Sequence, residues 1–179
     1  SRAAYKLKYF LQELKHFELN NINALDIGSS TGGFTQVLLE NEVSSVTCVD
    51  VGSNQLHERI KYHPKITFFE NTDIRNFQSK EIFEIVTCDV SFISILNILN
   101  DINRLAPKDI IILFKPQFEV GTNVKRDKKG VVKDKNAILR ARQKFVDSTL
   151  ALNWNLKYSS LSKLQGKDGN EEELFYFSK

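Results

Sequence analysis

The chain has 179 residues and a net charge of +3, and its 41% hydrophobic and 26% charged residues are typical of one globular domain with a full core. No apolar stretch is long enough to span a bilayer, and the two cysteines and three histidines lack metal-ligand spacing, so we expect neither a membrane partner nor a metal ion. The mildly basic charge permits a nucleic-acid partner without requiring one.

Short apolar runs alternate with amphipathic stretches, which is the pattern of strand–helix–strand units around a parallel sheet. Strands are predicted over residues 22–27, 45–51, 65–70, 83–89, 109–114, 154–161 and 173–177. Helices are predicted over residues 3–16, 34–40, 54–62, 93–105 and 135–152, with a basic loop at 121–133. We therefore predict an α/β fold, a Rossmann-like three-layer α/β/α sandwich around a seven-stranded, mostly parallel sheet.

A glycine-rich loop joins the first predicted strand to the next helix, in the segment Asp26-Ile27-Gly28-Ser29-Ser30-Thr31-Gly32-Gly33-Phe34. Glycines let the backbone turn sharply and approach a ligand, and the helix N-terminus favours an anionic group. That group could belong to a dinucleotide or be the carboxylate of S-adenosylmethionine. The GxGxxG dinucleotide pattern requires glycine where this chain has Ser30, and Asp26 suits a cofactor ammonium better than a pyrophosphate.

Acidic residues follow the second and third strands. Asp50 could accept hydrogen bonds from both ribose hydroxyls of an adenosine, a group that NAD and S-adenosylmethionine share. Asp73 could reach the adenine amine or simply cap a turn, since aspartate is a preferred cap. The loop and Asp50 together predict a cofactor that contains adenosine.

Opposite charges follow the fourth and fifth strands, at Asp89 and Lys115. Ligands of open α/β sheets bind beyond the carboxyl ends of the strands, so we expect both side chains to face the same crevice as the glycine loop. Lys115 could take a proton or stabilise an oxyanion there, or it could extend from a buried strand to solvent.

Several of these strings are similar to those of one known family. The chain resembles the TlyA (haemolysin A) group of FtsJ-like ribose 2′-O-methyltransferases in SRAAYKL at 1–7, DIGSSTGGFT at 26–35, DVGSNQL at 50–56, DVSFIS at 89–94, KPQFE at 115–119 and GNEE at 169–172. The resemblance covers essentially the whole chain. It implies a cytoplasmic enzyme that uses S-adenosylmethionine to methylate a ribose 2′-hydroxyl, that of a cytidine, in ribosomal RNA.

The resemblance also implies a catalytic tetrad, which maps to Lys6, Asp89, Lys115 and Glu172. The glutamate is chosen by its spacing from Asn170, and a shift by one residue within Glu171–Glu173 stays open. With the loop and the strand ends, the expected cofactor contacts are Asp26, Gly28, Ser29, Ser30, Thr31, Gly32, Gly33, Phe34, Asp50, Val51, Asp73 and Asp89.

The family further implies an S4-type RNA-binding domain upstream of a single methyltransferase domain over residues 1–179, which agrees with a chain that begins at Ser1 without methionine. The expected partner is ribosomal RNA or a ribosomal subunit, and the oligomeric state is left open. Phosphates would meet Arg2, Lys6, Lys8, Lys125, Arg126, Lys128, Lys129 and Lys133, although such runs also form solvated charged faces.

Three other functions stay open: a nucleotide-dependent oxidoreductase, a membrane-active haemolysin, and a non-catalytic RNA-binding or assembly factor that keeps the fold. Ser30 and the lysine–carboxylate set argue against the first. The modest amphipathic stripe over residues 3–17 fits packing on a sheet better than membrane binding. The complete tetrad argues against the third.

Overall fold

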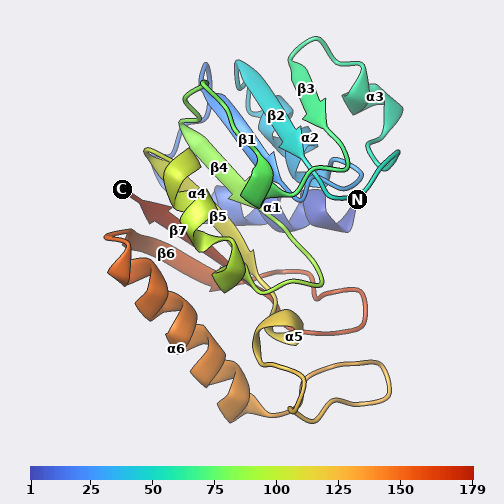
Figure 1. Cartoon of the computed structure of the whole chain (residues 1–179), viewed down its shortest axis with the longest axis vertical. Coiled ribbons are helices and arrows are strands. Elements are labelled where there is room, and N and C mark those ends of the chain that lie inside the picture. Colours follow the sequence, from blue (N-terminus) through green and yellow to red (C-terminus); the bar gives the residue numbers. More distant parts are fainter.

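The computed structural model describes residues 1–179, in which helices cover both faces of one seven-stranded sheet (Figure 1). The strands are β1 (Asn23–Ile27), β2 (Ser45–Val49), β3 (Ile66–Phe69), β4 (Ile85–Cys88), β5 (Asp109–Phe114), β6 (Asn155–Leu161) and β7 (Glu173–Ser178). Their order across the sheet is β3-β2-β1-β4-β5-β7-β6. All strands run in the same direction except β7, which is antiparallel to both of its neighbours, β5 and β6. The predicted class, the layers and the mostly parallel sheet are confirmed.

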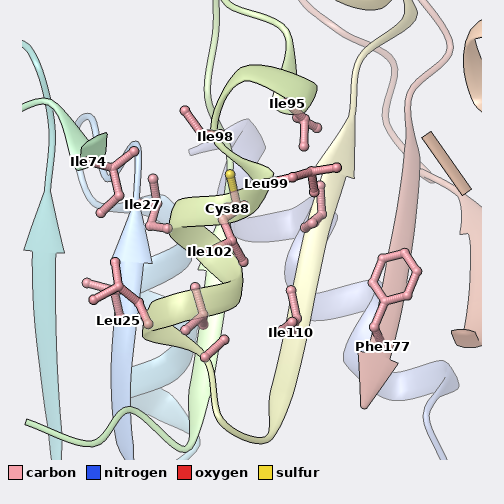
Figure 2. Packing of buried hydrophobic residues seen from close by; sticks show 14 of the residues in the cluster. Leu25, Ile27, Ile74, Cys88, Ile95, Ile98, Leu99, Ile102, Ile110 and Phe177 are labelled. Carbon is pink, nitrogen blue, oxygen red and sulfur yellow. The ribbon is translucent and has the colours of Figure 1, made fainter. Parts of the chain in front are cut away.

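The sheet separates two hydrophobic layers. α1 (Arg2–Glu13) and α2 (Gly33–Glu40) pack on one face, and α4 (Leu99–Leu105) and α6 (Lys135–Ala151) pack on the other (Figure 1). Figure 2 shows Leu99 and Ile102 of α4 lying over Leu25 and Ile110 of the central strands. Because both faces are covered, β1, β4 and β5 are buried along nearly their whole length instead of at alternate residues.

An aromatic cluster joins α6 to the antiparallel end of the sheet. The fully buried ring of Phe145 lies 5.4 Å from that of Phe114, 5.1 Å from Phe175 and 5.8 Å from Phe177, measured between ring centroids. Trp154 extends the cluster and donates from Nε1 to Asn103 Oδ1 at 2.8 Å, so its polar atom is satisfied. These contacts hold β7, and the residues that precede it, against the parallel strands.

Two predicted helices are shorter than the periodicity indicates. The predicted helix 54–62 is present only as α3 (Glu58–Lys61), because Asn54 has a left-handed backbone with φ 53° and the side chain of His57 caps the first turn. The predicted helix 93–105 is divided into a 3₁₀ turn, η2 (Ile95–Asn97), and α4. The two parts meet at Ile98, whose φ of −123° departs from helical geometry, and the turn begins at Ile95 because Ser94 caps it and Glu119 Oε1 accepts the Ile95 N–H at 2.8 Å.

Two further short elements were not predicted. α5 (Pro116–Glu119) begins at a proline, which is favoured at the first position of a helix. η1 (Ile74–Asn76) begins after Asp73, whose side chain accepts from Arg75 N. Both follow strands at the carboxyl edge of the sheet, where the chain must turn back.

The strand topology brings remote charged residues to one edge. Ile27 pairs with Val49 on one side and with Cys88 on the other, so Gly28, Asp50 and Asp89 follow three adjacent strands at the same level. The chain runs from β1 toward β3 on one side and returns to β4 on the other, which makes this a topological switch point.

Because β7 is antiparallel, its first residue, Glu173, pairs with Phe114 at the end of β5. Glu172 therefore arrives at the same edge of the sheet as Lys115. The segment 162–172, which joins β6 to β7, runs along this edge.

We expect Phe145→Ala to lower the free energy of unfolding by about 3–5 kcal/mol, because the substitution removes a fully buried ring from the aromatic cluster. Urea unfolding would measure this. Leu150→Ala is the control on the same helix, since Leu150 is 66% exposed, and it should change stability by no more than about 0.5 kcal/mol. Equal effects of the two substitutions would contradict this account of the core.

Candidate active site

A cavity of about 550 Å³ opens at the switch point, beyond the ends of β1, β2 and β4. Its volume is in the range of small-molecule and cofactor sites. Six of the predicted cofactor residues line it, namely Gly28, Ser30, Asp50, Val51, Asp73 and Asp89. Apolar walls come from Ile27, Val49 and Ile98, so the cavity combines an apolar surface with a few polar groups.

Gly28 brings the backbone of the loop against the end of β4. Its φ is +75°, and a Cβ there would lie 2.4 Å from the carbonyl oxygen of Asp89. Both the left-handed backbone and the lack of space require glycine. The backbone of the loop therefore lies close to the end of β4 and leaves room for a ligand in the cavity.

The Asp50 carboxylate ties together the two loops that border the cavity. Its Oδ2 accepts the N–H of Ser30 at 2.7 Å, and its Oδ1 accepts the N–H of Gly52 at 2.7 Å. Each carboxylate oxygen retains a second lone pair, so Asp50 can also accept hydroxyl groups of a ligand.

Asp73 lies at the cavity and also caps η1. Its Oδ1 accepts Arg75 N at 2.9 Å, and the Arg75 guanidinium lies 2.7 Å from Oδ2. These contacts hold the pKa of Asp73 below its usual range. Arg75 also lines the cavity, and no motif in the sequence had indicated it.

The other predicted loop residues do not line the cavity: Asp26, Ser29, Thr31, Gly32, Gly33 and Phe34. Phe34 is buried in the core beneath α2, because it lies on the face of the first turn that packs on the sheet. Gly33 instead allows close packing of α2 on α1, since a Cβ there would lie 2.8 Å from that of Ala3.

Asp26 is fully buried within β1. Its carboxylate accepts hydrogen bonds from Thr35 Oγ1 at 2.7 Å and Thr87 Oγ1 at 3.0 Å, and no cation pairs with it. Burial raises the pKa of Asp26 to about 7; the negative charges of Asp89 and Asp50 add to this rise, and the threonine hydroxyls oppose it.

Lys115 and Asp89 form an ion pair beside the cavity. Lys115 Nζ lies 2.5 Å from Asp89 Oδ1 and donates to Ser91 Oγ at 3.0 Å, and both charged side chains are largely buried. The Lys115 ammonium therefore occupies Asp89 Oδ1, and both partners that hold the ammonium, Asp89 and Ser91, line the cavity.

A second pair, Lys6 and Glu172, is more completely enclosed. Lys6 Nζ lies 2.6 Å from Glu172 Oε1, and Gln117 Nε2 donates to Glu172 Oε2 at 2.9 Å. Gln117 stands two residues after Lys115, so it links the two pairs. Its own Oε1 is a buried acceptor without a partner at this site.

The three consecutive glutamates point in different directions. Glu171 is exposed, Glu172 is 2% exposed and meets Lys6, and Glu173 accepts from the guanidinium of Arg142 at 2.7 Å. Glu172 is therefore the glutamate that joins the charged cluster.

The predicted RNA-binding cations lie on two surfaces that contact the segment 162–172. Arg2 and Lys8 are exposed on α1, and the Arg2 guanidinium donates to Gln165 O. The basic loop holds Lys125, Lys128, Lys129 and Lys133 at the surface and Arg126 partly buried. Val132 N donates to Asn170 Oδ1 at 3.0 Å, which ties this loop to the residues next to Glu172.

Ser91 and Gln117 were also missed by sequence reasoning. Both lie inside the strings that carry the family resemblance, DVSFIS and KPQFE, which was the available signal. Neither is ionisable, so charge alone could not indicate them.

No group of three or more His, Cys, Asp or Glu side chains is arranged to hold a metal ion. No helix has the length and apolar character needed to cross a membrane. Cys48 and Cys88 are buried and unpaired.

Comparison with known proteins identifies similar chains. The model of the FtsJ-like methyltransferase family matches residues 1–179. The 23S rRNA (cytidine-2′-O)-methyltransferase TlyA of Campylobacter jejuni is 56% identical over 179 residues, which is 100% of this chain and 70% of that protein. The 16S/23S rRNA (cytidine-2′-O)-methyltransferase TlyA of Mycobacterium tuberculosis is 36% identical over 183 residues, 98% of this chain and 67% of that protein.

A solved structure described as a hemolysin from Lactococcus lactis superposes with a TM-score of 0.92 and 34% identity, covering 100% of this chain and 88% of that one. The likeness therefore extends over all layers of the fold described above.

Gly28→Ala should lower stability more than Gly121→Ala. Both glycines have positive φ, so each substitution costs about 1–2 kcal/mol for a left-handed alanine. A Cβ at Gly121 meets nothing within 4 Å, whereas the contact of Gly28 with Asp89 O should add about 1–3 kcal/mol. Thermal and urea unfolding of the two variants would check this, and equal losses would contradict the close approach of the loop.

Asp26→Asn should become more stable relative to the unaltered chain as pH rises from about 4 to 7. The pKa of Asp26 is raised from 3.8 to about 7 on folding, so its favourable contribution is complete below pH 4 and is lost as pH rises through 7. The difference in unfolding free energy between the two proteins should change by at most about 1.4 kcal/mol per pH unit. Parallel stability curves from urea unfolding at pH 4–8 would contradict the raised pKa.

Proposed function

We propose, because this chain belongs to the FtsJ-like methyltransferase family, that it transfers a methyl group from S-adenosylmethionine to the ribose 2′-hydroxyl of a cytidine in ribosomal RNA. The observation that carries the proposal is the Lys115–Asp89 pair, buried beside a cofactor-sized cavity at the switch point of the sheet. The named activity of the similar proteins from Campylobacter jejuni and Mycobacterium tuberculosis supports the substrate.

The residues of the cavity fit S-adenosylmethionine. Asp50 would accept the ribose hydroxyls, Gly28 would allow the cofactor to lie against the loop, and Val51 and Asp73 would border the adenine. Asp26 would act from below the loop, where its negative charge favours a cationic ligand without touching it. When bound, the cofactor supplies a methyl group that is already activated on a sulfonium.

The protein must then activate the ribose 2′-hydroxyl, which is a weak nucleophile. Lys115 would lie against the ribose oxygen and either accept its proton or stabilise the negative charge that develops on it. Asp89 and Ser91 hold the ammonium in place beside the cavity, which both residues line. Alignment of the reacting atoms would supply much of the acceleration.

Lys6 and Glu172 complete the proposed tetrad from the other side. Their short contact, together with Gln117, fixes α1 and the segment 162–172 next to Lys115. Because Glu172 already accepts two hydrogen bonds and is buried, we assign the pair to positioning the site and to supplying positive charge near the RNA.

Ribosomal RNA, alone or within a ribosomal subunit, would be the partner, which would place the reaction in the cytoplasm. Arg2 and Lys8 on α1 and the cations of the basic loop border the site on two sides. Neutralisation of phosphates by these groups makes binding dependent on salt.

Lys115→Ala should lower methyl transfer to ribosomal RNA by at least about a hundred-fold, the lower range for loss of an acid–base group, while S-adenosylmethionine still binds. Incorporation of a labelled methyl group would measure turnover, and calorimetric titration would measure binding, with NADH as a ligand expected not to bind.

Lys108→Ala is the matched control, because Lys108 is exposed and immediately precedes β5, at the end opposite Lys115. It should leave both quantities unchanged. Unimpaired transfer by Lys115→Ala would overturn the assignment of Lys115.

A further inference from the structure

We propose that Tyr5 and Tyr9 on α1 form a stacking surface for unpaired bases of the RNA that flank the methylated nucleotide. This inference rests on the proposed function and specifies where part of the substrate lies. The two rings together are called the tyrosine surface below.

The tyrosine surface is exposed to solvent. Tyr5 is 51% exposed and Tyr9 is 38% exposed, and their rings stack at a centroid distance of 6.1 Å with 25° between the ring planes. The residues are four apart on a helix, which places them on one face. Two nearly parallel rings thus share an exposed position on α1.

Packing of α1 on the sheet does not require these rings. Ala4, Leu7 and Phe10 form the apolar buried face of the helix and lie in the core cluster with α2, and the fourth buried residue, Lys6, pairs with Glu172. A contact between neighbouring tyrosines would support the helix only slightly, by about 0.2–0.5 kcal/mol. Short polar side chains would suit the helix equally well at these two exposed positions. Two aromatic side chains there therefore indicate a binding role.

The charge around the tyrosine surface favours a polyanion. Arg2 and Lys8 are exposed on the same helix, and neither forms an ion pair. The helix carries one acidic residue, Glu13, which is engaged by Lys163 at 3.3 Å and by Ser160 at 2.6 Å. Aromatic rings between cations are the usual surface for single-stranded nucleic acid, because every base has a face that stacks.

The tyrosine surface begins beside Lys6 and Glu172 of the proposed catalytic tetrad. Lys6, the residue after Tyr5, turns inward to pair with Glu172, whereas Tyr5 turns outward. Arg2, one turn before Tyr5, contacts the segment 162–172 through Gln165 O. A strand whose 2′-hydroxyl reaches Lys115 would therefore have neighbouring nucleotides within reach of α1.

The test replaces both tyrosines with leucine, which keeps an apolar helix-forming side chain and removes the aromatic face. We expect Tyr5→Leu/Tyr9→Leu to raise roughly ten- to hundred-fold the KM for ribosomal RNA and the Kd for an unstructured RNA oligonucleotide, since stacking contributes at each base. The kcat at saturating RNA, the Kd for S-adenosylmethionine and the melting temperature should stay close to those of the unaltered chain.

Two matched variants distinguish stacking from a structural effect. Tyr5→Phe/Tyr9→Phe keeps both rings and should retain RNA binding. Tyr62→Leu removes a tyrosine that is 76% exposed on another element, directly after α3, and should change nothing.

Unchanged RNA affinity of the leucine variant would overturn the inference, as would a fall in melting temperature without weaker RNA binding, or a change in oligomeric state as its main effect. The proposed function can fail separately. An unaltered chain that binds RNA through the tyrosines without transferring methyl groups would support the tyrosine surface and overturn the proposed function.

Discussion

Two lysine ammonium groups are held almost out of solvent at one edge of the sheet, and the rest of the site depends on their pairing with carboxylates. Burial of an unpaired charge costs several kcal/mol, so neither lysine would remain there without its partner. Lys115 meets Asp89 at 2.5 Å and Lys6 meets Glu172 at 2.6 Å. Each pair joins segments far apart in the chain, so the charges proposed to act in catalysis also fix how α1, β4, β5 and β7 meet.

The electrostatics differ on the cofactor side of the site, where negative charges lie near one another. Asp26, Asp50 and Asp89 each follow or end a neighbouring strand, and their negative charges act on one another. Asp50 is satisfied by two backbone N–H groups, whereas Asp26 has only threonine hydroxyls and a raised pKa. The concentration of negative charge favours a ligand that carries positive charge, and S-adenosylmethionine carries it on both its sulfonium and its ammonium.

The segment 162–172 connects the chemical centre to the surfaces proposed for RNA. It contains Glu172, accepts a contact from Arg2 through Gln165 and holds the basic loop through Asn170. Contacts with RNA on α1 or on the loop would therefore act on residues next to the tetrad. This short segment thus contacts both the surfaces proposed for RNA and Lys6.

The sequence by itself determined the order of the strands along the chain, the glycine loop, and the charged residues that follow β2, β4 and β5, because buried parallel strands are mostly apolar runs with clear ends. The sequence segments that resemble the family indicated the proposed catalytic tetrad and the cofactor. Only the tertiary structure decided which of three glutamates faces Lys6, that Asp26 and Phe34 are enclosed, and that Gln117 and Ser91 hold the charged pairs. It also decided that the predicted helix 93–105 begins only at Ile95, whose N–H Glu119 accepts, and that it divides at Ile98. Each of these depends on a partner from a distant segment, and the local pattern of a sequence contains no information on which distant side chain will arrive.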